Sequence, residues 1–170
     1  AVPLLPTRNA APTKRSQEDR AMVLLAGADV LDGNGRRIGQ IQAGLLLNRN
    51  LPFIDHINEI VYPEGSLPFG SRGTATLFLD DVRISTNVRL FGNDPDNPEA
   101  SPSRAIGTRV SQTVRDAVLG RGNTWLDRAF VVNEWYVSAY QPLANGSGQR
   151  IGMLYVGYLE RPFTLLKYAA

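Results

Sequence analysis

Two stretches in the last third of the chain combine β-branched and aromatic residues with a short polar turn. Residues 128–143 and 151–161 are strand-forming runs in which apolar residues occupy alternate positions. The Asn145-Gly146 turn between them predicts an antiparallel hairpin. The intervening positions are small or aromatic rather than charged, which favours central strands covered on both faces.

Elsewhere the apolar pattern predicts two further hairpins and two helices. The predicted hairpins join residues 21–28 to 37–47 and residues 74–79 to 82–89. One helix is predicted from the cap residue Asn50 to about Tyr62, and a second is capped by Ser111 and ends near Arg121. A further strand begins at Trp125. Five strands joined largely by hairpins predict an α+β fold, with an antiparallel sheet flanked by helices.

A glycine-rich pattern occurs twice, and each match lies 113 residues after its counterpart. The matched pairs are Gly33 and Gly146, Gly35 and Gly148, Arg37 and Arg150, Ile38 and Ile151, Gly39 and Gly152, and Gly44 and Gly157. A shift of this size is about one small domain. The repeat therefore predicts two tandem copies of one domain, the first represented only by its closing hairpin.

This repeat divides the chain into four parts. Residues 21–50 are predicted to be the closing hairpin of a truncated first module, and residues 51–162 a complete second module. Residues 1–20 carry three prolines and predict an extended, loosely held arm. Residues 163–170 are predicted to start an exit helix, so we expect the sequence to be cut from a longer protein.

Composition excludes several classes of function. Hydrophobic residues make up 43% of the chain and charged residues 20%, which argues against wholesale disorder. The net charge of +2 comes with scattered arginines, so no nucleic-acid partner is expected. Cysteine is absent and His56 is the only histidine, which excludes thiolate chemistry and a histidine-rich metal site, and no cofactor is predicted. No apolar run is long enough to span a membrane.

Several motifs, in one order, resemble the membrane-proximal module of a Cache (PAS-like, PDC) extracytoplasmic sensor domain. They are TATLF at 74–78, DVRISTNV at 81–88, RAIGTRVS at 104–111, AVLGRG at 117–122, RAFVVNEWY at 128–136 and IGMLYVG at 151–157. Upstream, AGLLLNRN at 43–50 resembles the junction that leaves the distal module of a double-Cache protein. The resemblance covers residues 21–162 of the chain. It implies a PAS-like five-stranded antiparallel sheet, no catalysis in this domain, and a pocket for a small molecule, with organic acids as the expected ligands.

Six polar residues are candidates for that pocket. Tyr136 and Tyr140 share one face of a strand, where their hydroxyls could meet a carboxylate or they could simply pack on the sheet. Arg109 precedes a helix start and is either part of an anion subsite or a surface arginine. The others are Arg83 and Asn87 on one strand face, with Asn133 near a strand end.

Alternative interpretations remain for three features of the sequence. Arg83 could instead pair with Asp80 or Asp81. Trp135 could cover the pocket, or anchor the opposite, helix-covered face of the sheet, which we favour. The polar run at 91–104 alternates Asp and Asn but lacks the glycine and closing glutamate of a calcium loop, so a solvated loop is expected and no metal site is predicted.

The leading hypothesis is the periplasmic ligand-sensing domain of a transmembrane receptor, with a two-component histidine kinase favoured over a chemoreceptor. Any membrane contact would be made by helices outside this sequence, and a homodimer is possible. The alternative is a ligand-free structural or dimerisation spacer of a chemoreceptor. A hydrolase is disfavoured because no nucleophile elbow, phosphate-binding glycine loop or metal-ligand cluster is found.

Overall fold

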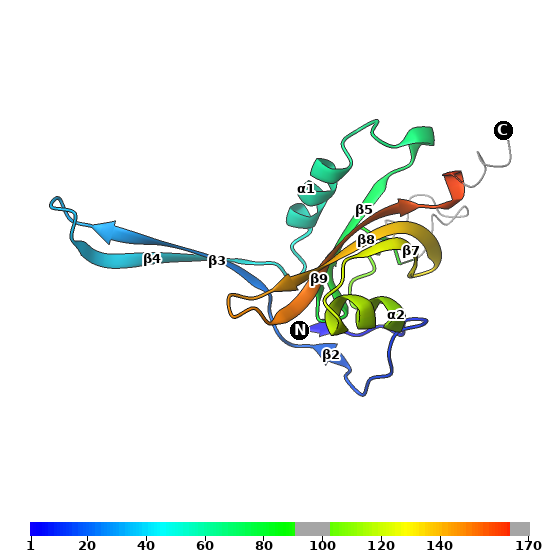
Figure 1. Ribbon diagram of the computed structural model, residues 1–170, viewed down its shortest axis with the longest axis horizontal. Coiled ribbons are helices and arrows are strands. Elements are labelled where there is room, and N and C mark those ends of the chain that lie inside the picture. Colours follow the sequence, from blue (N-terminus) through cyan, green and yellow to red (C-terminus); the bar gives the residue numbers. More distant parts are fainter. Residues whose placement is uncertain (91–102, 164–170) are drawn as a thin grey trace.

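The computed structural model describes residues 1–90 and 103–163, and its main body is a five-stranded antiparallel sheet (Figure 1). The strands are β5 (Gly73–Leu79), β6 (Val82–Thr86), β7 (Trp125–Val131), β8 (Glu134–Ala144) and β9 (Arg150–Leu159). Their spatial order is β6-β5-β9-β8-β7, so the hairpin β8–β9 is central, as predicted. The α+β fold with an antiparallel sheet is confirmed.

The helix α1 (Leu51–Val61) covers one face of the sheet at β5 and β6. The Asn50 side chain caps it by accepting a hydrogen bond from the Phe53 amide at 3.2 Å, and Pro52 lies in the first turn, as the sequence predicted. Ile54 is fully buried against Leu77, Ile84 and other apolar residues of this face.

The opposite face is covered by α2 (Gln112–Arg115), which continues as a π-helical turn (Asp116–Gly120). The sequence predicted one regular helix here. Ser111 occupies the cap position, but its side chain makes no capping hydrogen bond, and the Gln112 amide donates instead to the Asn9 carbonyl at 2.7 Å. Val114 and Val118 pack into the larger of two apolar cores, beside the aromatic residues of β8 and β9.

A second hairpin, β3 (Val23–Leu31) with β4 (Arg37–Leu46), extends away from the body (Figure 1). Its two strands pair only with each other. Every residue of β4 is exposed, and so is every residue of β3 except Val30. This hairpin therefore has no core of its own.

Residues 1–20 form an extended arm that is firmly held, which corrects the prediction of a loose one. The short strands β1 (Val2–Pro3) and β2 (Gln17–Glu18) pair with each other, and Val2 and Glu18 are buried. The arm is fixed by long-range hydrogen bonds, such as that from the Leu5 amide to the Gly107 carbonyl at 2.9 Å. Such partners lie about a hundred residues away and leave no local sequence signal.

Two predictions fall wholly or mostly outside the described residues. The polar loop predicted at 91–104 is described only from residue 103, and the exit helix predicted at 163–170 only at Phe163. Within the described part, β6 ends at Thr86 rather than at residue 89, and the turn at Asp80 has a φ of 53°.

Candidate functional site

Arg83 is the largest fully buried side chain of the body, with 1% of its surface exposed. It lies on β6, and its guanidinium stacks on the ring of Phe78 on the neighbouring strand, 4.9 Å from the ring centroid. Nη1 donates to the Thr108 hydroxyl at 3.0 Å and to the Arg109 carbonyl at 3.1 Å. Buried positive charges in proteins normally have a carboxylate partner.

Among the residues that the structure describes, Arg83 has no such partner. The two predicted alternative partners form their ion pairs with other arginines: Asp80 with Arg15 and Arg20, and Asp81 with Arg109, Arg15 and Arg115. Nε of Arg83 is buried and has no hydrogen-bond acceptor within the described ranges. A buried ion that lacks a counter-ion costs several kcal/mol of stability. An anion bound beside Nε would remove that cost.

Three tyrosines lie close enough to Arg83 to affect its pKa. They are Tyr136 and Tyr140 on β8 and Tyr155 on β9. Tyr140 and Tyr155 face each other across the two strands, with ring centroids 4.8 Å apart. The Tyr155 hydroxyl lies 3.0 Å from the Thr74 hydroxyl. The buried Tyr140 hydroxyl makes no well-aligned hydrogen bond in the described part of the chain, but it lies close enough to the Arg83 guanidinium for their contact to raise the pKa of Arg83 and oppose the rise in its own.

Burial controls the protonation of this cluster. It lowers the pKa of Arg83, although the nearby tyrosines oppose that shift, and a guanidinium stays protonated in proteins. Burial also raises the pKa of Tyr140 to about 12 and that of Tyr155 well above its usual value. At neutral pH the cluster therefore presents one positive charge and neutral hydroxyls that can donate hydrogen bonds. This combination suits a carboxylate.

Gly157 makes room for the cluster. A Cβ at this position would lie 2.5 Å from the Tyr155 hydroxyl and 2.8 Å from the Val137 carbonyl. The Tyr155 ring therefore leans over the backbone of its own strand toward Thr74, and only glycine permits that position.

The structure brings three of the six predicted site residues together and places the other three elsewhere. Arg83, Tyr136 and Tyr140 share the cluster. Asn87 accepts a hydrogen bond from the Ala75 amide at 2.7 Å, and Asn133 is exposed in the turn between β7 and β8. Arg109 binds Asp81 and the Ala11 carbonyl.

Two neighbours of Arg83 were not among the predicted residues, namely Tyr155 and Thr108. Trp135, expected to anchor the helix-covered face, is about half exposed; it meets Phe130 edge to face, and the guanidinium of Arg128 lies over its ring. It therefore neither covers the cluster nor packs under α1.

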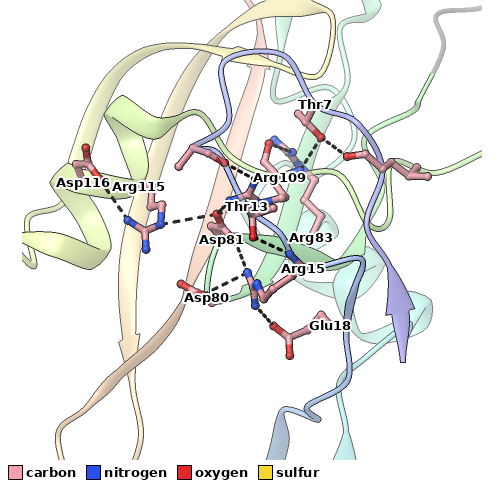
Figure 2. Close-up of polar contacts among 12 residues, drawn as sticks. Thr7, Thr13, Arg15, Glu18, Asp80, Asp81, Arg83, Arg109, Arg115 and Asp116 are labelled. Carbon is pink, nitrogen blue, oxygen red and sulfur yellow. Dashed lines mark hydrogen bonds and ion pairs between the residues drawn. The ribbon is translucent and has the colours of Figure 1, made fainter.

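A separate cleft of about 510 Å³ lies between the N-terminal arm and the turn that joins β5 to β6. Figure 2 shows Asp81 among the arginines of this region. The cleft is lined by Ala11, Pro12, Thr13, Arg15, Glu18, Asp19, Arg20, Asp80, Asp81, Arg109 and Arg115. Its four arginines meet four carboxylates, and the guanidinium of Arg109 is already bound to Asp81, so the cleft has no excess positive charge for an anion.

An antiparallel five-stranded sheet with helices on both faces is consistent with a PAS-like fold of the Cache type. The family model for "Single cache domain 3" matches residues 45–169, and the chain belongs to this family. Cache domains are typically extracytoplasmic ligand-sensing domains of signalling receptors, commonly bind small molecules and are generally not catalytic.

No curated protein and no solved structure matches the chain. Within residues 1–90 and 103–163, no helix is long and apolar enough to cross a membrane. The same residues contain no group of three or more histidine, aspartate or glutamate side chains that could hold a metal ion.

Proposed function

We propose that this domain is the periplasmic sensor of an inner-membrane receptor, and we favour a two-component histidine kinase as that receptor. We further propose that the domain binds a small organic acid at Arg83. The observation that carries the proposal is the buried guanidinium, whose Nε has no well-aligned acceptor among the described residues, next to the Tyr140 hydroxyl, which contacts that guanidinium without forming a well-aligned hydrogen bond. A carboxylate is the ligand group that satisfies both at once.

The ligand is expected to be small and to carry one carboxylate at this end. Phe78, Met153 and Val118 belong to the surrounding core, so the walls around the charged group are apolar. Binding would draw the Tyr140 hydroxyl and the Arg83 guanidinium toward the same anion. Because Arg83 also bonds the 108–109 segment, ligand binding can shift that segment and so favour one of two conformations of the receptor.

Calorimetric titration with acetate, propionate, pyruvate and succinate tests the proposal. At least one acid is expected to bind the wild-type domain, and Arg83→Met is expected to weaken that binding by at least tenfold. Arg121→Met is the matched control, because Arg121 is exposed and lies away from the cluster on the loop that follows the π-helical turn. Equal binding by the wild type and Arg83→Met would refute the site.

Arg109, Asn87 and Asn133 are tested separately in the same assay. Arg109→Ala is expected to have a smaller effect than Arg83→Met, since its guanidinium is engaged by Asp81. An affinity unchanged from the wild type would remove Arg109 from the ligand site, and the alanine variants of the two asparagines are read in the same way.

A structural or dimerisation spacer that binds no ligand is the second candidate. It is favoured by the packing of Tyr136, Tyr140 and Tyr155 within the same apolar cluster as Phe78 and Val118. A spacer would bind none of the acids up to millimolar concentration, and Arg83→Met would then change only stability. Binding of any of the acids with Arg83 dependence excludes this candidate.

A further inference from the structure

We infer that the N-terminal arm, residues 1–20, is a regulatory strap. Its docking on residues 107–112 holds the Arg83 guanidinium in position, so that arm docking and ligand binding strengthen each other. The inference rests on the proposed function as far as the ligand is concerned, and it adds what controls the affinity of that site. The link between the arm and Arg83 is measurable without any ligand.

Residues 107–109 fix the position of Arg83 at both ends of the residue. The Arg83 amide donates to the Thr108 carbonyl at 2.9 Å, and the Gly107 amide donates to the Arg83 carbonyl at 2.9 Å. At the tip of the side chain, Nη1 donates to the Thr108 hydroxyl and to the Arg109 carbonyl. These two oxygens hold Nη1, and Nε, which has no well-aligned acceptor among the described residues, is left for the ligand. A shift of this segment therefore moves the charged group that the ligand must meet.

The arm is hydrogen-bonded to the same segment. The Arg109 amide donates to the Thr7 hydroxyl at 3.0 Å, and the Gln112 amide donates to the Asn9 carbonyl at 2.7 Å. Figure 2 shows Thr7, Arg109 and Arg83 close together. Arg109 thus binds the arm through its amide and Arg83 through its carbonyl. Movement of the arm has a direct route to the guanidinium.

The backbone of the arm lies closest to this segment at Gly107. The Leu5 amide donates to the Gly107 carbonyl at 2.9 Å. A Cβ on Gly107 would lie 2.2 Å from the Pro3 carbonyl, and the φ of 87° at this position also favours glycine. The arm therefore lies directly on the backbone that holds Arg83, and its release would free that backbone.

Charges and hydrogen bonds, rather than apolar packing, attach the arm. Of the apolar side chains in residues 1–20, all of which the structure describes, only Val2 is buried. Arg15 joins Glu18 of the arm, at 3.0 Å, to Asp81 of the body, at 3.1 Å. An element with few buried apolar contacts can open without unfolding the core. The docked and the released arm are thus the two states that a regulatory strap requires.

The direction of regulation follows from the way in which Arg83 is held. With the arm docked, residues 107–109 are fixed and the ligand meets a guanidinium that is already in place. With the arm released, the ligand must first order that segment, so its apparent affinity falls with the fraction of molecules whose arm is docked. Linkage is reciprocal, and a bound carboxylate therefore favours docking of the arm by the same factor.

Arg15→Met is the variant that loosens the arm and spares the body. The two buried carboxylates that Arg15 contacts, Glu18 and Asp81, each keep another arginine as ion-pair partner. Lys14→Met is the matched control. It removes the same charge from the next residue, whose side chain is exposed and makes no ion pair with the described residues.

Thr7→Val is a second variant, which keeps the shape of the side chain and removes the acceptor of the Arg109 amide. In the ligand-free protein, both variants are expected to speed hydrogen exchange of the Gln112 amide at least fivefold and to shift the Arg83 Nε–H resonance, while Lys14→Met behaves as the wild type. Calorimetry with acetate, propionate, pyruvate and succinate should then show binding at least fivefold weaker in both variants. Saturation of the wild type with the bound acid should slow exchange of the Gln112 amide.

Three results would overturn the inference. Exchange of Gln112 as slow in both variants as in the wild type would show that these contacts do not hold the arm. An unchanged Arg83 resonance in variants whose arm exchanges faster would show that docking does not reach the guanidinium. Acid binding that is unchanged or tighter in both variants would leave the carboxylate site intact and remove the strap. If no acid binds the wild type, the carboxylate function fails by itself, whereas a shifted Arg83 resonance still supports control of Arg83 by the arm.

Discussion

Arg83→Met removes the buried charge while keeping an unbranched side chain of similar length, and we expect it to stabilise the ligand-free domain. The wild-type guanidinium is fully buried and has no carboxylate partner among the described residues. Replacing buried ions by apolar residues of similar volume is often stabilising by ~1–4 kcal/mol.

Favourable contacts of Arg83 reduce that gain. The substitution removes two hydrogen bonds and the stacking on Phe78, a cation–π contact of about 2 kcal/mol when desolvated. The Thr108 hydroxyl keeps a partner, since it also donates to the Ala105 carbonyl at 2.6 Å. The net expectation is therefore an increase of at most ~2 kcal/mol in the free energy of unfolding.

Urea unfolding followed by tryptophan fluorescence measures this change. An increase of ~2 kcal/mol moves the midpoint up by about 1 M for a domain of this size. Arg121→Met is expected to leave the midpoint unchanged. A decrease of more than ~1 kcal/mol in Arg83→Met would refute the reasoning, because it would show that the guanidinium is a net stabilising part of the core.

Three further predictions concern pH and packing. The pKa of Tyr140 is raised to about 12 by burial, so the stability that its neutral form contributes is complete below its ordinary pKa of about 10 and is lost as the pH rises toward 12. Titration of the absorbance at 295 nm should show Tyr140 ionising at this raised pH. Ionisation of Tyr140 near pH 10 would contradict the prediction. The pKa of Glu18 is lowered, chiefly by its hydrogen bond from Arg20. The stability that the Glu18 carboxylate contributes is therefore present above its unfolded pKa of about 4.5 and is lost as the pH falls through the folded value. Glu18→Gln should remove that acid-dependent part of the unfolding free energy, and an unchanged dependence of stability on acid pH would count against the prediction. Gly152→Ala should destabilise the body by more than ~2 kcal/mol, because the added Cβ would meet the Phe78 carbonyl. Thermal melting measures this loss, and an unchanged melting temperature would contradict the prediction.

Local signals predicted most of the fold. Asn50 and Pro52 marked the start of α1, and the Asn145-Gly146 turn marked the central hairpin, because caps and turns depend on residues that are neighbours in the sequence. The π-helical turn after Arg115 and the holding of the N-terminal arm depend on contacts made in three dimensions. The sequence pattern carries no signal for either.

The candidate site was predicted only in part for a related reason. Strand alternation placed Tyr136 and Tyr140 on one face, and both lie near Arg83. Extending the strand pairing from the turn would have given Tyr140 a different partner, because the irregularity between Leu143 and Ala144 shifts the register by one residue. The sequence therefore did not identify Tyr155 as the residue opposite Tyr140. Arg109 has the chemistry of an anion site, but Asp81, far away in sequence, already engages it.

Nuclear magnetic resonance of the Arg83 side chain tests the central proposal most directly. The Nε–H signal, assigned by its loss in Arg83→Met, is followed while acetate, propionate, pyruvate and succinate are added. A ligand carboxylate at the cluster should move this signal downfield in a saturable manner, because Nε gains the acceptor that it lacks among the described residues. A signal that stays unchanged with every acid would contradict ligand binding at Arg83.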